Sequence, residues 1–133
     1  MHRFETRVWY EDTDMAGIVY HANYLKFIER ARSDALRVHG VDQRAMKADG
    51  LVFVVRRMTV EWRAPAVFED VLTVTTAATQ IKRASATLRQ IVLRGDQALF
   101  AADVQIACMD ASGAPVRIPE AALAALRRLG AEG

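Results

Sequence analysis

The chain has 133 residues, which is the length of one ordinary globular domain. Hydrophobic residues make up 52% of it and charged residues 26%, a composition that excludes a chain disordered throughout. The 18 basic and 16 acidic side chains leave a net charge of +2 without a concentrated basic patch, so no nucleic-acid partner is expected.

The first third of the chain predicts a strand, a polar loop and a long helix. Residues 3–10 alternate in polarity, and the following residues share one face of the expected strand: Phe4, Thr6, Val8 and Tyr10. Residues 11–17 form a polar loop that contains one glycine. From Tyr20 to His39, apolar residues recur at helical spacing: Tyr24, Phe27, Ile28, Ala31, Ala35 and Val38. Gly40 then ends the expected helix.

The remaining residues predict four strands and two shorter helices. The helices are expected over 42–47 and 119–129, and the strands over 51–62, 71–82, 84–94 and 97–109. In the strand 51–62, one face is expected to carry Val52, Val54, Met58, Val60 and Trp62. This order implies an α+β fold in which an antiparallel sheet lays its apolar face against the long helix. Only the tail, residues 130–133, is expected to be frayed.

The cysteine content and the N-terminal sequence indicate the compartment. Cys108 is the only cysteine, so an intrachain disulfide is excluded, and it is expected to be a small buried hydrophobic residue. Residues 1–7 lack the apolar segment of a signal peptide, and no stretch approaches the ~20 apolar residues of a membrane span. We therefore expect a cytoplasmic protein with no membrane span.

Common catalytic and cofactor-binding motifs are absent from the sequence. There is no Gly-x-Ser-x-Gly elbow, no Gly-x-Gly-x-x-Gly and no P-loop. The three histidines, His2, His21 and His39, are too far apart for a helical metal pair. We expect no metal and no cofactor, so an enzyme built from this chain would rely on carboxylates, one histidine and backbone amides.

The densest polar cluster lies just before the long helix and has two interpretations. Glu11, Asp12 and Asp14 could cap the helix, because acidic groups are stabilised near a helix N-terminus. The same helix start offers unpaired amides that can hold a carbonyl oxygen as it becomes negative during acyl transfer. A carboxylate beside it could attack that carbonyl or activate water. Gly17 would allow the close backbone approach that the second interpretation needs.

Other polar and aromatic residues also have two interpretations. His21 is either a polar residue of the first helical turn or part of a site, and Tyr20 and Tyr24 either pack the helix on the sheet or shape a pocket. Lys82 and Arg83 lie between two expected strands, where they form either a solvated turn or a phosphate clamp.

The segment from Val8 to Tyr24, VWYEDTDMAGIVYHANY, strongly resembles the opening motif of the hotdog-fold acyl-CoA thioesterases. It is most similar to the YbgC type, which is associated with the Tol-Pal envelope system, and the 4-hydroxybenzoyl-CoA thioesterases are near relatives. The likeness continues in the stretches FIERAR, MTVEW and APA and covers almost the whole chain. Trp9 departs from the tyrosine usual in the subfamily, and Met15-Ala16 varies a changeable pair. The resemblance implies one hotdog domain over residues 1–133, with the sheet wrapped around the long helix.

The resemblance also implies roles for individual residues. Asp14 matches the family's catalytic carboxylate, either as a nucleophile that forms a mixed anhydride or as a general base. The backbone amide of His21 matches the donor that polarises the thioester carbonyl, and its side chain would orient substrate or water. Gly17 would lie against the substrate.

Five further positions match regions that bind substrate in the family. Tyr20 and Tyr24 would shape the acyl pocket. Lys82, Arg83 and Ser85 match a region in which relatives contact the CoA phosphates.

The implied activity is hydrolysis of acyl-CoA to a free acid and CoA. Two alternatives stay open: a non-catalytic module that binds acyl carriers or acyl-CoA, and another hotdog chemistry such as hydration of an enoyl thioester. Release of a free thiol distinguishes hydrolysis from both. The expected partners are acyl-CoA, with acyl carrier protein as a second candidate carrier, and further copies of the chain. A homodimer or homotetramer is expected because edge-to-edge pairing removes an exposed sheet edge.

Overall fold

The computed structural model describes residues 1–130 of the chain. Its strands are β1 (His2–Arg7), β2 (Val52–Trp62), β3 (Val71–Ile81), β4 (Ser85–Arg94) and β5 (Gln97–Met109). Its α-helices are α1 (Asn23–Val38), α2 (Gln43–Ala48) and α3 (Glu120–Arg128), and a short 3-10 helix, Tyr10–Asp12, precedes α1. Each strand and helix expected from the sequence is present.

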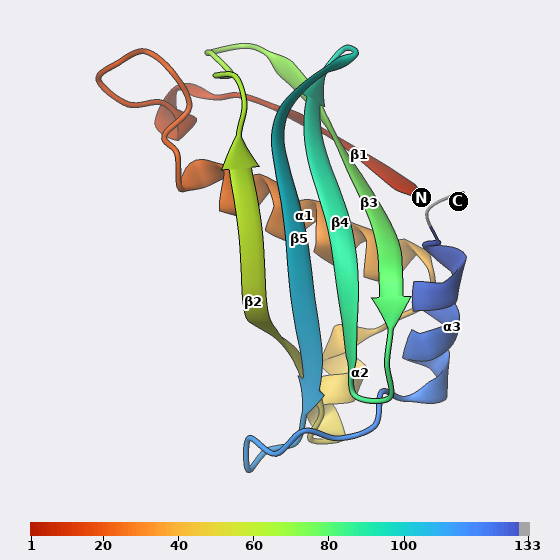
Figure 1. The fold of residues 1–133 in the computed structure, drawn as a ribbon. Helices are drawn as coiled ribbons and strands as arrows, with labels where there is room; N and C mark the ends of the chain where they lie inside the picture. Colours follow the sequence, from red (N-terminus) through yellow and green to blue (C-terminus); the bar gives the residue numbers. More distant parts are fainter. Residues whose placement is uncertain (131–133) are drawn as a thin grey trace.

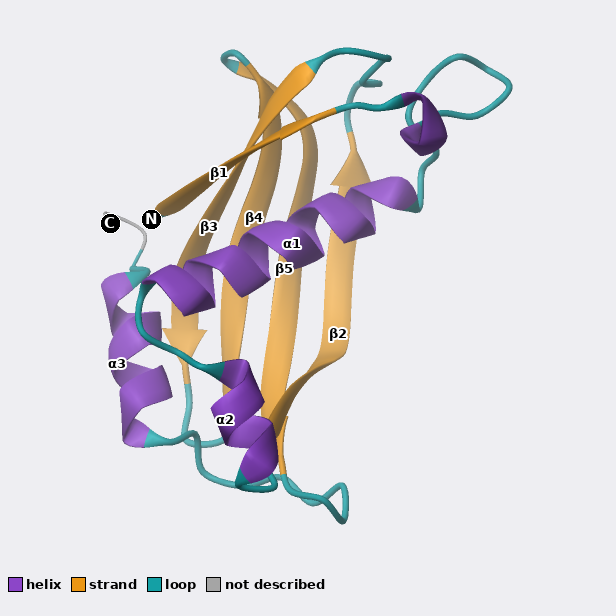
Figure 2. Ribbon diagram, turned by 180° about the vertical axis from the view of Figure 1, so that it is seen from behind, coloured by secondary structure: helices purple, strands orange, loops and turns teal. Residues whose placement is uncertain are grey.

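The strands form one antiparallel sheet in the order β1-β3-β4-β5-β2 (Figure 1). Short turns connect β3, β4 and β5, so these three strands are neighbours in the sheet as well as in the chain. β1 and β2 form the two edges. The long helix α1 crosses one face of the sheet (Figure 2), which is the arrangement that the hotdog resemblance implies.

The predicted apolar face of α1 packs against the sheet. Five of its six predicted members are at most 2% exposed: Tyr24, Phe27, Ile28, Ala31 and Ala35. Val38, the sixth, is 55% exposed because it is the last residue of the helix. Burial of this stripe, with no side-chain cap at the helix start, shows that tertiary packing stabilises α1 more than local capping does.

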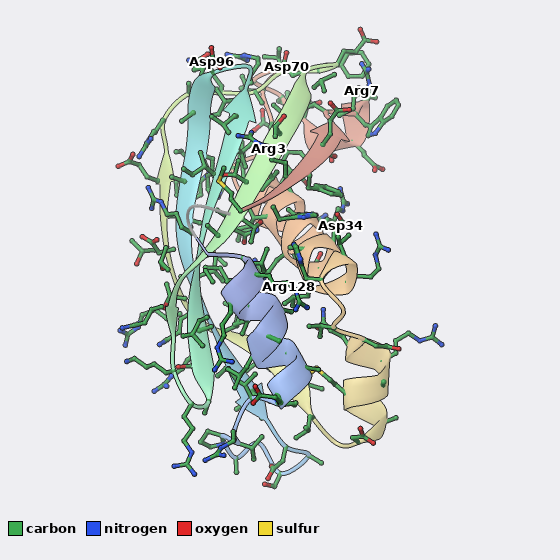
Figure 3. The ribbon with its side chains drawn as sticks, turned by 90° about the vertical axis from the view of Figure 1, so that its right-hand side faces the viewer. Arg3, Arg7, Asp34, Asp70, Asp96 and Arg128 are labelled. Carbon is green, nitrogen blue, oxygen red and sulfur yellow. The ribbon has the colours of Figure 1, made fainter. Side chains whose placement is uncertain are left out.

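Polar contacts join the N-terminal strand to α1 and the end of α1 to α3. The ring of His2 lies 2.8 Å from the carboxylate of Asp34 on α1, and Arg128 of α3 donates a hydrogen bond to the backbone carbonyl of His39. Figure 3 shows Asp34 and Arg128 on the side of the molecule where β1 lies.

A β-bulge at Arg56 makes the predicted face of β2 wrong for two residues. The register shifts there by one residue, which reverses the alternation of side chains along the strand. Phe53 before the bulge and Met58 after it both pack against the core. Val52 and Val54 therefore lie on the face opposite Met58, although a regular alternation places all three together.

The first strand is shorter than its alternating pattern predicts. It ends at Arg7, and the chain then turns into the 3-10 helix, so Tyr10 is 83% exposed and is not on a buried face. The turn closes because the backbone amide of Trp9 donates to the Asp12 carboxylate at 2.8 Å. A side chain that bonds nearby backbone thus overrides the strand pattern.

Gly130, the last residue that the structure describes, is bonded to two other parts of the chain. Gly130 forms a bridge with Ala78, and its carbonyl accepts a hydrogen bond from the Met1 amino group at 3.1 Å. The other residues of the expected frayed tail, 131–133, lie outside the described part of the chain.

Candidate active site

Asp12 anchors the loop that leads into α1. It is 4% exposed, and its carboxylate accepts hydrogen bonds from the Trp9 amide and from Nδ2 of Asn23, at 2.8 and 2.9 Å. Its backbone carbonyl accepts a further bond from the Tyr20 amide at 2.9 Å. Asp12 therefore ties the loop to the first residue of α1, but it does not cap the helix, whose N-cap has no side-chain hydrogen bond.

Asp14 has a different environment, in a tight turn closed by Gly17. Its Oδ1 accepts a hydrogen bond from the Ala16 amide at 2.8 Å, and its backbone amide donates to the Ile18 carbonyl at 3.0 Å. Gly17 has φ +80°, a conformation that other residues rarely adopt, so a glycine closes this turn without strain. Oδ2 of Asp14 accepts no hydrogen bond within residues 1–130. The exposed carboxylate thus keeps one oxygen free.

A cavity of about 390 Å³ opens where this loop, the start of α1 and the end of β2 meet. Its lining combines one carboxylate, one imidazole and one guanidinium with apolar and aromatic walls: Asp14, Ile18, Val19, His21, Tyr24, Trp62, Arg63, Ala64 and Pro65. The fold therefore brings Asp14 and His21 into one cavity.

Unpaired amides lie at the start of α1, where His21 lines the cavity. Within residues 1–130, the backbone amides of His21 and Ala22 donate no hydrogen bond to protein, and the N-cap Ala22 has no side-chain cap. Such amides, at the positive end of the helix dipole, can stabilise an oxygen that gains negative charge.

Trp62 of β2 orients this helix start. Its Nε1 donates to the backbone carbonyl of His21 at 3.0 Å, and its ring centroid lies 5.9 Å from the His21 ring. The ring of Tyr20 also packs against the His21 imidazole, with 4.6 Å between the two ring centroids. The peptide between His21 and Ala22 is therefore held by a neighbouring strand.

Tyr24 forms an apolar wall of the cavity. It is 2% exposed, its ring stacks on Phe100 at 5.0 Å, and its hydroxyl accepts a hydrogen bond from the Ala66 amide at 3.0 Å. Burial raises the pKa of Tyr24, against the opposing effects of that hydrogen bond and of Arg94. The hydroxyl therefore stays protonated and neutral in the apolar wall. Tyr20 is 49% exposed and, like Gly17, does not line the cavity.

The turn between β3 and β4, which holds Lys82 and Arg83, lies at the opposite end of the sheet from the loop that precedes α1 (Figure 1), and Ser85 begins β4 after this turn. Ser85 pairs with the last part of β5, opposite Ala107, whereas Trp62 pairs with its first part, opposite Phe100. The Lys82 amide donates to the Ser85 carbonyl at 2.7 Å, which closes the turn between β3 and β4. Within one chain, these residues are not brought to the cavity.

Six lining residues are not singled out as site residues by the sequence pattern, and among them only Trp62 and Arg63 carry polar side-chain groups. The sequence places Trp62 on the expected sheet face and then shows a strand ending before Pro65. Arg63, which lines the cavity, forms an ion pair with Glu61. The available signal was their position at a strand end, where loop side chains of a scaffold commonly form sites.

Comparisons with known proteins agree with this architecture. The family model for the thioesterase-like superfamily matches residues 8–126. The acyl-CoA thioester hydrolase YbgC of Escherichia coli O6:H1 is 42% identical over 111 residues, which cover 83% of each chain. The acyl-CoA thioesterase YbgC of Haemophilus influenzae is 38% identical, with 95% of this chain and 94% of that protein covered.

Solved structures are similar over nearly the same residues. A probable thioesterase from Bartonella henselae has 39% identity and a TM-score of 0.85, with 89% of this chain and 98% of that chain covered. A hypothetical protein from Aquifex aeolicus has 31% identity and a TM-score of 0.88, with 93% and 98% covered. These structures and the family match confirm the hotdog fold.

Within residues 1–130, no helix is long and apolar enough to cross a membrane.

The family model spans most of the chain, and the curated relatives are named for the activity that the opening motif implies. The chain belongs to the YbgC-type acyl-CoA thioesterases of the thioesterase-like superfamily.

Proposed function

We propose that Asp14 and the backbone amide of His21 carry out the hydrolysis of acyl-CoA to a free acid and CoA. The observation that supports this is the presence of a free carboxylate oxygen and an unpaired helix-start amide at one cavity. Neither of these two groups forms a hydrogen bond within residues 1–130. Both oxygens of the Asp12 carboxylate, in contrast, accept one.

The geometry leads to a two-part mechanism. The thioester carbonyl oxygen accepts a hydrogen bond from the His21 amide, and one such donor contributes about 3 kcal/mol to transition-state stabilisation. Oδ2 of Asp14 either attacks the carbonyl carbon, which releases CoA and leaves a mixed anhydride that water hydrolyses, or removes a proton from the attacking water. In both cases one water is consumed, and an acid and a thiol are released.

The walls and size of the cavity favour a short aliphatic or aromatic acyl group. Ile18, Val19 and Tyr24 supply apolar surface, and the volume of about 390 Å³ is at the lower end of typical ligand pockets. The His21 imidazole, which also lines the cavity, would orient the substrate or the water. Thioesters of acyl carrier protein are a second candidate substrate class.

We also propose that two chains assemble through the β2 edges. The edge carries exposed apolar side chains, with Val55 46% and Trp62 47% exposed, and pairing would cover them. Lys82, Arg83 and Ser85 could then approach the CoA phosphates only from a second chain, since within one chain they lie at the far end of the sheet.

Thiol release from a panel of acyl-CoAs, from short to long and including benzoyl-CoA, tests this proposal. Asp14→Asn keeps the size of the side chain but removes its charge, and we expect its rate to fall at least about a hundredfold. Asp96→Asn, in the exposed turn between β4 and β5, is the matched control and should hydrolyse normally.

Hydrolysis by Asp14→Asn at a rate near that of the wild type would exclude Asp14 as the reacting carboxylate. Binding of acyl-CoA without thiol release from any substrate would favour the non-catalytic module, and water addition to an enoyl thioester without thiol release would favour hydration.

A further inference from the structure

Arg32 is a buried cation without an acidic partner. It lies on the inner face of α1 and is 9% exposed. Its Nη1 donates a hydrogen bond to Oε1 of Gln90 at 2.9 Å, and within residues 1–130 no carboxylate lies within 4.0 Å of its guanidinium. Burial lowers the pKa of Arg32, against the opposing charge of Glu29. A buried charge is costly unless it is paired, so this residue requires an explanation.

Gln90 orients the guanidinium but cannot neutralise it. Gln90 is fully buried, and its Nε2 donates to the Ile28 carbonyl and to Oγ1 of Thr76, both at 2.9 Å. Its amide is therefore fixed, with Oε1 directed at Arg32. Nε and Nη2 of Arg32 have no protein acceptor in the described residues, and they are not sealed in the core, because no buried side-chain nitrogen or oxygen there lacks a partner.

Arg32 lines a second cavity, of about 220 Å³, between α1 and β2. The β2 residues of its lining belong to the first part of that strand. Ser33 and Gln43 contribute polar groups, and Leu36, Phe53 and Val55 contribute apolar walls. The cavity shares no lining residue with the Asp14 cavity.

Arg32 favours an anion at this cavity, although one carboxylate also lines it. Glu29 also lines it, is exposed, and accepts a hydrogen bond from the Ser33 hydroxyl at 3.4 Å. The adjoining cavity, which shares Ser33 and Gln43 with the cavity between α1 and β2, carries Arg44 and also Arg37, which is paired with Asp34. The carboxylate that also lines that cavity, Asp42, is engaged by the amides of α2.

We infer that the cavity between α1 and β2 binds a small carboxylic acid, whose carboxylate accepts hydrogen bonds from Nε and Nη2 of Arg32. A guanidinium binds a carboxylate through two parallel hydrogen bonds, and a pair so formed neutralises the buried charge. The short apolar or aromatic group of the acid lies against Phe53 and Val55. This inference does not depend on which residues hydrolyse the thioester.

Side-chain and backbone nitrogen NMR of the whole chain tests the inference. Sodium hexanoate and sodium benzoate are titrated, with hexanamide and benzamide as uncharged controls of the same shape. We expect the acids to shift the Arg32 Nε–H signal and the backbone signals of Ser33 and Gln43. The amides should bind at least about tenfold more weakly, because hydrogen bonds to charged groups are the stronger ones.

Three variants add independent readouts. Glu29→Gln removes the competing carboxylate and should tighten binding of the acids. Gln43→Glu places a new negative charge on the wall of the cavity and should weaken binding of the acids. Both substitutions are at the surface of the cavity. Arg32→Met should abolish binding, and if this variant does not fold, the two surface variants still decide the outcome.

Three results would each overturn the inference. The first is equal binding of acid and amide. The second is a set of shifts confined to the Asp14 cavity, or no shift of Arg32 at saturating acid. The third is an affinity for acids that neither Glu29→Gln nor Gln43→Glu changes.

Discussion

Two aspartates that are two positions apart have opposite environments. Asp12 is buried and bonded to the Trp9 amide and the Asn23 side chain, whereas Asp14 is exposed with one free oxygen. The difference arises from the tight turn at Gly17, which directs the chain back toward α1 and leaves Asp14 at the cavity. At the scale of single residues, hydrogen-bond engagement therefore separates the structural carboxylate from the candidate catalytic one.

Tyr24→Phe should destabilise the protein through one lost hydrogen bond. The Tyr24 hydroxyl is the acceptor for the buried Ala66 amide, and removal leaves that amide without a partner at a cost of about 1–3 kcal/mol. Urea unfolding at neutral pH measures the free energy of unfolding. Tyr20→Phe is the matched control, because Tyr20 is half exposed, and it should change stability little. Equal stability of Tyr24→Phe and the wild type would contradict this role.

At the scale of elements, α1 combines three functions along its length. Its first turn presents the unpaired amides, its inner face packs on the sheet and carries Arg32, and its later turns hold β1 through Asp34. The contact with β1 is polar, so the docking of that strand depends on the ionisation of Asp34.

Stability should fall in acid through Asp34. Hydrogen bonds from Arg37 and then from His2 hold the pKa of Asp34 below its usual value of 3.8, against the effect of burial. A lowered pKa in the folded state contributes stability that is present above the unfolded pKa and is lost as the pH falls through the folded pKa. We expect this contribution to be complete at about pH 5 and to decline below about pH 4.

Asp34→Asn isolates this effect. At neutral pH the variant should be less stable by about 1 kcal/mol or less, since the pair is partly exposed. Its stability should then fall less than that of the wild type between about pH 5 and about pH 3. Urea midpoints measured across that range test this, with Asp96→Asn as the control. Parallel pH profiles for wild type and Asp34→Asn would rule out the contribution.

At the scale of the whole molecule, the free edge of β2 lies beside the Asp14 cavity. Trp62 ends this strand, is 47% exposed and lines the cavity, so a partner on this edge would also border the site. Assembly and activity should therefore be linked.

Val55→Asp tests that link. The exposed Val55 lies on the free edge, and a charge there should oppose the pairing of two edges. Light scattering should give the mass of a dimer or tetramer for the wild type and a lower mass for Val55→Asp, with a parallel loss of thiol release. Val38→Asp, at the exposed end of α1, is the control that should keep both. A wild-type monomer with full activity would contradict the proposed assembly.

Much of the fold follows from local patterns in the sequence. Alternation and helical spacing predict the strands and α1, because one apolar face must be buried in each. The pattern is wrong at Val52 and Val54, since the bulge at Arg56 reverses an alternation that sequence spacing alone treats as continuous. It is also wrong at Tyr10, where the Asp12 carboxylate bonds the backbone into a turn.

The sequence by itself determined the element order and the family motif, and it pointed to Asp14 and His21 as the candidate pair, because these depend on residues close together in the chain. Only the tertiary structure decided which distant residues meet. Trp62 contacts His21 across 41 positions, and Arg32 contacts Gln90 across 58. It likewise placed Lys82 away from the cavity within one chain. Contacts of this kind depend on strand order and register, which are set by packing of the whole sheet on α1 and not by any local pattern.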